Sequence, residues 1–277
     1  MTPFTVRVAL AQSGLPPLEA QVLLAHALRV SRAWLAAHPE APLPQVKASA
    51  YYLLAQRRRD GEPVAYLVGK REFWGLELAV TPNVLIPRPE TETLVQEALA
   101  RLPRGRELAI LDLGTGSGAI ALALARERPH ARIVATDASN AALQVARANA
   151  RRVGAYNVEF VEADWYTHPT LAGGAARFDV IVSNPPYIGA GDPHLAQGDV
   201  RYEPLAALTS GADGLDALRT IVAGARERLT RGGFLLVEHG YDQADGVKAL
   251  YVAASFSNHA AARDLAGIVR VAAGQSA

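Results

Sequence analysis

A short run of polar and cyclic residues, Asn184-Pro185-Pro186-Tyr187, directly follows the apolar run 178–183. Both prolines have a fixed φ and no N–H, and a residue before proline is restricted to extended backbone, so the run is stiff and rich in hydrogen-bond acceptors. The amide oxygen of Asn184 and the carbonyl of Pro185 are two such acceptors, and Tyr187 adds an aromatic face. This set suits a planar group that carries an NH2, such as a carboxamide or the exocyclic amine of a base. A plain Pro-Pro turn that ends a strand is the simpler alternative for the tetrapeptide alone.

A glycine-rich turn, Gly114-Thr115-Gly116-Ser117-Gly118, lies between an expected strand and an expected helix. Glycines at this position let the backbone turn tightly and approach a ligand closely. The spacing of Gly114, Gly116 and Ala119 also fits a dinucleotide fingerprint, so this turn alone does not choose between nucleotide-binding classes.

Acidic and aromatic residues follow the next two expected strands. Asp137 can accept hydrogen bonds from both hydroxyls of a ribose, and Asp164 can accept from an adenine amine while the Trp165 indole covers the adenine face. Together with the glycine turn, these residues predict an adenosine pocket at the ends of three strands. A dehydrogenase does not need the acceptors of Asn184 and Pro185 beside such a pocket, whereas a methyltransferase that acts on nitrogen does.

The elements that position these residues alternate between strand and helix from about residue 107 onward. The pattern predicts strands at 107–113, 131–136, 158–161, 178–183 and 233–238, helices at 117–128, 140–153, 215–229 and 242–252, and two final strands. This order is typical of an α/β protein with a doubly wound, mostly parallel sheet. The loop 188–210 is long enough to expect a working role.

Residues 1 to about 75 have helical periodicity instead. We expect helices near 18–28, 31–38 and 43–60, followed by a hairpin in which a strand at 71–80 turns at 81–83 and returns at 84–86. The expected domains are therefore a helical substrate-recognition domain (1–70), a β-hairpin linker (71–88) and a sheet domain (89–277). The run Arg57-Arg58-Arg59 is compatible with an acidic or RNA-bound partner and equally with a solvated last helical turn.

Composition narrows the function classes. The chain of 277 residues contains no cysteine, which excludes disulfides, thiolate catalysis and cysteine-based zinc sites, and we expect no metal. A net charge of +1 excludes a dominant electrostatic footprint for nucleic acid at the whole-chain level. No signal-peptide pattern is present and no apolar stretch approaches the ~20 residues that span a bilayer. We expect a cytoplasmic monomer with no membrane contact and no stable nucleic-acid binding.

Several motifs together resemble one family. They are the segments 85–92 (Leu-Ile-Pro-Arg-Pro-Glu-Thr-Glu), 112–118, 184–188, 202–205, 213–215 and 238–240. Over nearly its whole length the chain is similar to the bacterial release-factor glutamine methyltransferases, which methylate the side-chain amide nitrogen of the glutamine in the Gly-Gly-Gln motif of class 1 peptide release factors. Asn-Pro-Pro-Tyr is shared with amino-methylating DNA and RNA enzymes, and the segment 85–92 is much more specific. Ile268 stands where a polar residue is common in the family.

The resemblance implies a seven-stranded, Rossmann-like methyltransferase sheet, S-adenosylmethionine as the cofactor and a class 1 release factor as the substrate. It implies that the cofactor is lined by Gly114, Thr115, Gly116, Ser117, Gly118, Asp137, Trp165 and Asn184, and the adenine argument adds Asp164. It also implies that Asn184, Pro185, Pro186 and Tyr187 hold the substrate glutamine.

An amide nitrogen is a poor nucleophile because its lone pair is delocalised into the carbonyl. We expect Asn184 and Pro185 to accept the two N–H bonds of the glutamine, which fixes the nitrogen and favours the transition state, while the Tyr187 face favours the departing positive charge. No general base is evident, and we expect His239 to be a structural histidine.

Two other functions use the same residues. A nucleic-acid amino-methyltransferase of the N6-adenine type predicts a stronger basic surface and a base-recognition domain. A non-catalytic, adenosine-binding assembly factor, in which the helical domain does the work, has no need of an intact glycine turn, Asp137 and Asn184 together.

Overall fold

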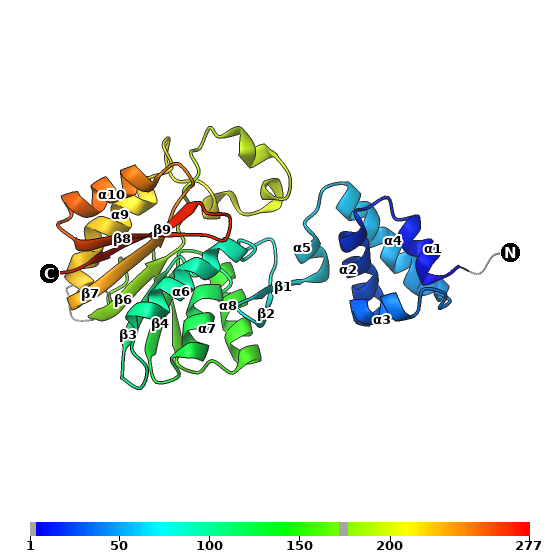
Figure 1. Ribbon diagram of the computed structural model, residues 1–277, viewed down its shortest axis with the longest axis horizontal. Helices are drawn as coiled ribbons and strands as arrows, with labels where there is room; N and C mark the ends of the chain where they lie inside the picture. Colours follow the sequence, from blue (N-terminus) through cyan, green and yellow to red (C-terminus); the bar gives the residue numbers. More distant parts are fainter. Residues whose placement is uncertain (1–3, 172–176) are drawn as a thin grey trace. The chain divides into compact units, whose positions relative to one another are not determined.

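The computed structural model describes residues 4–171 and 177–277 of the chain. The chain divides into two compact units (Figure 1). The first is the helical unit, which comprises the chain up to Lys70 together with Ala196–Tyr202. The second is the sheet unit, which comprises Arg71–Leu195 and Glu203–Ala277. None of the helices within 4–171 and 177–277 is long and apolar enough to cross a membrane.

The helical unit contains short helices around an apolar core that includes Leu23, Leu24 and the ring of Tyr51. Its helices are α1 (Val6–Ala11), α2 (Pro17–Leu28), α3 (Arg32–Ala37), α4 (Gln45–Arg59) and α5 (Val64–Val68). The expected helices near 18–28, 31–38 and 43–60 are confirmed as α2, α3 and α4. The sequence did not predict α1 and α5, because a helix of one or two turns is too short to show a 3.6-residue period.

The three consecutive arginines at the end of α4 make contacts inside the helical unit. Arg57 pairs with Glu62, and Arg59 donates to the carbonyl of Ser13. Arg58 has only 19% of its side chain exposed. The run is therefore neither a freely solvated helix end nor an unpaired basic patch.

Arg58 also fastens part of the long 188–210 loop to α4. Its guanidinium donates to both carboxylate oxygens of Glu19, at 2.7 and 2.9 Å, and to Asp199 at 2.7 Å. The Tyr202 hydroxyl donates to the carbonyl of Asp60, 2.8 Å away. These bonds explain why Ala196–Tyr202 groups with the helical unit, although it lies far from that unit in sequence.

The hairpin is present, but its strands and turn differ from the expected ones. Strand β1 (Lys70–Phe73) pairs with β2 (Leu76–Ala79). The turn lies at Trp74 and Gly75, which both have positive φ values of 53° and 68°. Two successive left-handed residues make a tight two-residue hairpin turn, so the expected single strand over 71–80 is wrong. The expected return strand 84–86 is also wrong, because residue 84 is a bend and residues 85 and 86 have irregular backbone.

The sheet unit is built on seven strands, as the sequence and the family resemblance predicted. They are β3 (Ala109–Leu113), β4 (Arg132–Asp137), β5 (Val158–Glu162), β6 (Phe178–Ser183), β7 (Leu229–Glu238), β8 (Ser257–Arg263) and β9 (Val269–Gln275). Their order is β5-β4-β3-β6-β7-β9-β8. Strands β3 to β7 run parallel, and β9 is antiparallel to both neighbours. The strand order reverses between β3 and β6, which is where open α/β sheets bind ligands.

Helices cover both faces of this sheet (Figure 1). On one face lie α6 (Glu92–Arg101), α7 (Ala119–Glu127) and α8 (Asn140–Val153), whose apolar residues share a core with Ile110 of β3. On the other face lie α9 (Asp216–Ala225) and α10 (Ala244–Ala253), which share a second core with Leu111 and Leu113. Because successive side chains of β3 alternate between these cores, the strand is buried on both faces and its carboxyl end is held rigidly.

Candidate active site

The carboxyl ends of β3, β4, β5 and β6 open onto one cavity of about 370 Å³ within the sheet unit. Most of the residues that the sequence proposed for the site line this cavity: Gly114, Thr115, Gly116, Ser117, Asp137, Asp164, Trp165, Asn184 and Pro186. Gly118, Pro185 and Tyr187 are not among the lining residues. Strand polarity thus brings together residues from four separate parts of the chain.

The glycine turn needs glycine at both of its ends. Gly114 has φ 70°, and a Cβ there would lie 3.6 Å from the Trp165 ring. Gly118 has φ 86° and begins α7, and its Cβ would lie 3.2 Å from Leu122 and 3.3 Å from Ala146. Left-handed backbone is costly for any residue with a Cβ. The turn therefore combines a glycine-only conformation with close packing against α7 and α8.

Asp112 supports this turn from beneath. It is fully buried, and its Oδ2 accepts from the Thr115 hydroxyl at 2.6 Å and from the Ala121 N–H at 3.2 Å. Its Oδ1 has no hydrogen-bond partner. Burial raises the pKa of Asp112 to about 7, although the two hydrogen bonds lower it. The sequence placed Asp112 in a motif but gave it no role; a carboxylate just before a glycine turn was the available signal.

Asp137 holds the middle of the turn and faces the cavity. Its two oxygens accept from the N–H groups of Gly116 and Ser139, each at 2.9 Å. Burial raises the pKa of Asp137, and these two backbone hydrogen bonds oppose that shift. Each carboxylate oxygen has more than one lone pair, so both remain able to accept a hydrogen bond from a bound hydroxyl.

Asn184 follows β6 directly, and its orientation is set by a partner from another segment. The hydroxyl of Ser183 donates to the carbonyl of Leu113 at 2.8 Å, which fastens β6 to β3 immediately before the loop. The Asn184 Nδ2 donates to the Thr91 hydroxyl oxygen at 3.1 Å. Tyr187 turns away, and its hydroxyl donates to Glu238 at 3.2 Å.

Two segments that the sequence left without a role also line the cavity. They contribute Asn83, Val84, Leu85, Pro87, Arg88 and Thr91 from one stretch and Pro204, Ala206 and Ala207 from another. Buried Glu203 joins them, since it accepts from Arg88 at 2.6 Å and from the N–H of Ile86 at 3.4 Å. Leu85, Pro87, Arg88, Thr91, Glu203 and Pro204 belong to motifs of the family resemblance, which was the signal in the sequence that could have found them.

Comparison with known proteins gives one consistent result. Residues 5–69 match the PrmC N-terminal domain, and residues 105–256 match a methyltransferase domain. The release factor glutamine methyltransferase of Burkholderia pseudomallei is 50% identical over 279 residues, which cover 99% of this chain and 97% of the relative. That of Escherichia coli is 44% identical over 273 residues, covering 98% and 97%. The chain belongs to the release factor glutamine methyltransferase family.

The family, the enzyme class and S-adenosylmethionine as cofactor, all expected from the sequence, are thereby confirmed. A solved methyltransferase from Pyrococcus furiosus is 20% identical, with a TM-score of 0.54 over 73% of this chain and 89% of that one, and it supports the fold.

The cavity of this methyltransferase fits the cofactor chemically. Asp137 offers carboxylate oxygens at the end of β4, and Asp164 with Trp165 offers an acceptor and an aromatic face at the end of β5. Between these residues the backbone of the glycine turn is accessible to a ligand, because a Cβ added to Gly116 would have no other atom within 4 Å. An adenosine group requires these three features: an acceptor pair for the ribose, a ring to stack on and room for close approach.

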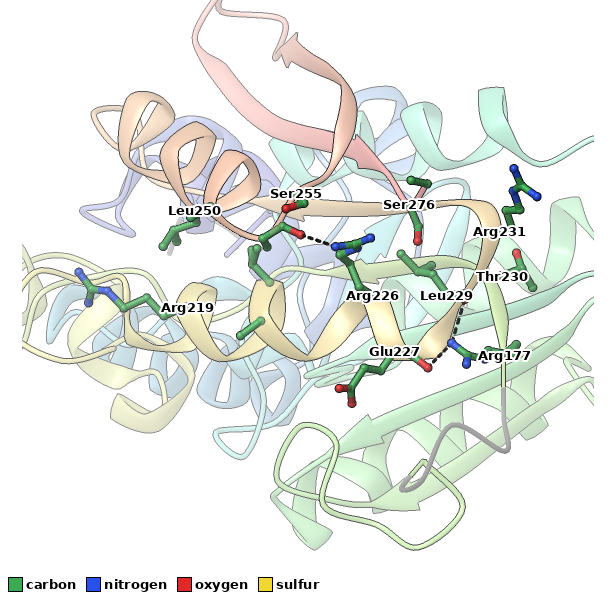
Figure 2. Close-up of a pocket in the computed structure, with 15 residues that line it drawn as sticks. Arg177, Arg219, Arg226, Glu227, Leu229, Thr230, Arg231, Leu250, Ser255 and Ser276 are labelled. Atoms are coloured by element: carbon green, nitrogen blue, oxygen red, sulfur yellow. Dashed lines mark hydrogen bonds between the residues drawn. The ribbon is translucent and has the colours of Figure 1, made fainter.

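A second and larger cavity of about 1130 Å³ lies elsewhere in the sheet unit (Figure 2). Figure 2 shows the Arg177 side chain reaching the backbone beside Glu227, and Arg226 donates to the carbonyl of Ala254. Leu229 and Thr230, at the amino end of β7, also line it. It thus lies at the opposite edge of the sheet from the strand ends that bind ligands. None of the expected site residues lines this cavity.

His239 does not line the 370 Å³ cavity of the methyltransferase. Its ring is buried, and Nδ1 lies 2.8 Å from the carbonyl of Gly240. Burial lowers the pKa of His239. A neutral ring held in this way fits the structural role expected of it.

Proposed function

We propose that this protein transfers the methyl group of S-adenosylmethionine to the side-chain amide nitrogen (N5) of the glutamine in the Gly-Gly-Gln motif of class 1 peptide release factors. One observation carries the proposal: Asn184 lines the same cavity as the glycine turn and Asp137, and its amide nitrogen is already bonded to Thr91. The names of its relatives supply the substrate, since both are release factor glutamine methyltransferases.

The cofactor is held by groups from three strand ends in this proposal. Asp137 accepts from the ribose hydroxyls, Asp164 accepts from the adenine amine, and the Trp165 indole covers the adenine. The backbone of the turn from Gly114 to Gly118 lies along the remaining part of the cofactor. When bound, S-adenosylmethionine supplies an electrophilic methyl group on a positively charged sulfur.

The substrate glutamine is held by the loop after β6. The Asn184 side-chain oxygen and the Pro185 carbonyl accept the two N–H bonds of its amide, and Pro186 lines the pocket beside it. These N–H groups become more acidic as the new C–N bond forms, so both acceptors bind the transition state more strongly than the ground state. As the C–N bond forms and the bond from sulfur to the methyl group breaks, the cofactor leaves as a neutral thioether and the amide nitrogen carries a positive charge. This cationic nitrogen is strongly acidic and loses its proton to solvent without a dedicated base.

Tyr187 has a supporting role in this proposal. Its hydroxyl is bonded to Glu238, and the residue is not among those that line the cavity. This hydrogen bond holds the loop on which Asn184 and Pro185 lie, and that is the role we propose for the Tyr187 hydroxyl.

The proposal extends to the other parts of the chain. We assign recognition of the release factor to residues 1–70, which include the match to the PrmC N-terminal domain, a linking function to residues 71–88, and catalysis to residues 89–277. We also propose a cytoplasmic monomer. Size-exclusion chromatography with light scattering tests the oligomeric state, and a dimer mass would contradict it.

A labelling assay tests the reaction. Tritiated S-adenosylmethionine is offered with a purified class 1 release factor, with the same factor carrying alanine in place of the Gly-Gly-Gln glutamine, and with duplex DNA or RNA. We expect label on the unaltered factor only. Label on nucleic acid would support the amino-methyltransferase alternative, and no label on any substrate would support an adenosine-binding assembly factor.

A further inference from the structure

Helix α8 carries a fully buried polar side chain, that of Asn149, which has no part in the proposed mechanism. It is 0% exposed and is not among the residues that line the 370 Å³ cavity. A buried amide is costly unless its oxygen and its NH2 group are hydrogen-bonded. The partners of Asn149 therefore show which parts of the sheet unit it holds together.

Two of its hydrogen bonds hold the backbone of Ala79, the last residue of β2. The Asn149 Oδ1 accepts from the Ala79 N–H at 2.7 Å, and the Asn149 Nδ2 donates to the Ala79 carbonyl at 3.0 Å. The side chain thus pairs with both backbone groups of Ala79, as a neighbouring strand would. The chain continues from Ala79 into Asn83, Val84 and Leu85, which line the cavity.

The third hydrogen bond joins Asn149 to the glycine turn. The Nδ2 also donates to the Ser117 carbonyl, 2.9 Å away. Ser117 is 3% exposed and lines the cavity, and the neighbouring Gly116 is held separately, by the bond from its N–H to Asp137. Both Nδ2 hydrogens of Asn149 are therefore donated to backbone carbonyls, one on each of two segments, and its oxygen accepts from one of them.

We propose that Asn149 is a positioning residue for the cofactor, because it joins the glycine turn to the segment that follows β2 and so fixes two parts of the cavity lining relative to each other. Neither segment can shift without breaking a buried hydrogen bond. Such coupling is reciprocal, so a cofactor that binds the turn also stabilises the bonds at Ala79. The inference rests on the cofactor site of the proposed function, and it does not depend on which group accepts the methyl.

The substitution Asn149→Asp tests the coupling with little change in size. It keeps an oxygen that accepts from the Ala79 N–H, and it replaces the NH2 group that donates to Ser117 by a second oxygen. We expect the Kd for S-adenosylmethionine, measured by calorimetry, to rise about fivefold or more, as for loss of a coupling between two sites.

Asn157→Asp is the matched control. The Asn157 Nδ2 also donates to two backbone carbonyls, those of Arg128 at 3.3 Å and Ala131 at 3.0 Å. Asn157 immediately precedes β5, at the amino edge of the sheet, and does not line the cavity. The control loses donors of the same kind away from the cofactor, so its Kd should equal that of the unaltered protein.

Amide hydrogen exchange provides a measurement that needs no substitution. We expect S-adenosylmethionine to slow exchange of the Ala79 amide in the unaltered protein about fivefold. The Gly75 amide is the reference, because it lies in the same hairpin and donates to the Glu72 side chain at 2.6 Å instead. Its exchange should not respond to the cofactor. In Asn149→Asp the response of the Ala79 amide should be lost.

The outcomes separate this inference from the proposed function. Asp137→Ala tests the cofactor site itself, and unchanged S-adenosylmethionine affinity in that variant would overturn the site and with it this inference. If Asp137→Ala weakens binding, an unchanged Kd in Asn149→Asp, or an equal loss in Asn157→Asp, would overturn the positioning role alone.

Thermal melts identify a variant that fails to fold. In that case the unaltered protein decides. An Ala79 amide whose exchange responds to S-adenosylmethionine no more than that of Gly75 would overturn the inference, and a selective response of Ala79 would support it.

Discussion

At the scale of single residues, the loop after β6 offers acceptors and hardly any donors. Pro185 and Pro186 lack an N–H, and one of the two Asn184 Nδ2 hydrogens is donated to Thr91. A substrate amide therefore meets oxygens at this edge of the cavity. The amide nitrogen is a weak nucleophile. We therefore expect these residues to raise the rate mainly by orienting the amide and by stabilising the charge that develops on it in the transition state.

The first prediction concerns Asn184. Asn184→Ala removes one of the two acceptors, and we expect kcat for release factor methylation to fall about 10²–10³-fold. Calorimetry with S-adenosylmethionine should show cofactor binding largely retained, because Asp137 and the glycine turn are untouched. Equal losses in cofactor affinity and in kcat would contradict this division of roles.

The second prediction concerns Asp137, whose carboxylate we assign to the ribose. Hydrogen bonds to a charged group are worth about 1.5–3 kcal/mol, so Asp137→Ala should weaken S-adenosylmethionine binding about tenfold to a hundredfold. Asp245→Ala, an exposed change in α10, serves as the control and should leave calorimetric affinity unchanged. Unchanged affinity in Asp137→Ala would remove this residue from the cofactor site.

At the scale of elements, the glycine turn and the 196–202 segment each depend on one local feature. The turn depends on left-handed backbone at Gly118, packed against α7 and α8. The segment depends on Arg58, whose charge is shared between Glu19 and Asp199. In both cases an element is positioned by contacts with residues distant in sequence.

The third prediction concerns Gly118. Gly118→Ala should lower the unfolding free energy by about 1–3 kcal/mol, since left-handed backbone alone costs a residue with a Cβ about 1–2 kcal/mol and the new methyl group crowds Leu122 and Ala146. Gly105→Ala is a matched control, because Gly105 also has positive φ but nothing lies within 4 Å of its added Cβ. Urea denaturation should show a smaller loss for the control. Equal losses would mean that crowding at Gly118 contributes nothing.

The fourth prediction concerns Arg58. Arg58→Ala removes the ion pairs that hold Asp199 to α4, and we expect amide hydrogen exchange within 196–202 to accelerate about tenfold, which corresponds to about 1.4 kcal/mol of local stability. Arg57→Ala is the control, because Arg57 is 48% exposed and, within residues 4–171 and 177–277, its side chain pairs only with nearby Glu62. Faster exchange of 196–202 in the control as well would argue against a specific role for Arg58.

At the scale of the whole molecule, two buried carboxyl groups lie near the carboxyl ends of the parallel strands, at the edge of the sheet where the 370 Å³ cavity lies. Asp112 is the fourth residue of β3, and Glu238 is the last residue of β7. Each carboxyl group has one oxygen without a hydrogen-bond partner. Burial raises the pKa of both groups to about 7, above the usual values of 3.8 and 4.5. Ionisation of these groups at neutral pH therefore costs the folded state stability.

The fifth prediction follows from the sign of these shifts. Between about pH 4.5 and pH 7 the folded protein retains protons that the unfolded chain has lost, so the unfolding free energy should fall as pH rises, by up to about 1.4 kcal/mol per pH unit for each group. Below about pH 3.8, the usual pKa of Asp, and above about pH 7 these two groups should add no slope. Urea denaturation at several pH values should show a flatter profile for the Asp112→Asn/Glu238→Gln double variant. The same slope in both proteins would contradict the prediction.

Local sequence patterns were sufficient to predict most of the fold and several residues of the candidate site. Alternating strands and helices predicted the doubly wound sheet, because hydrophobic period and chain order limit how strands can pair. The glycine turn, Asp137, Trp165 and Asn184 were found because each follows an apolar strand, and parallel strands bring their carboxyl ends to one edge. The family motifs then selected glutamine over a nucleic-acid base as the substrate group.

The position of the hairpin turn and the hydrogen bonding of Asn184 could be determined only from the tertiary structure. The hairpin turn at Trp74 and Gly75 was missed because a tryptophan with positive φ is unusual, and no local pattern predicts it. Asn184 donates to Thr91, which lies about 90 residues before it in the sequence. Hydrogen-bond direction inside a buried network depends on which groups folding brings into contact, and sequence spacing alone does not contain that information.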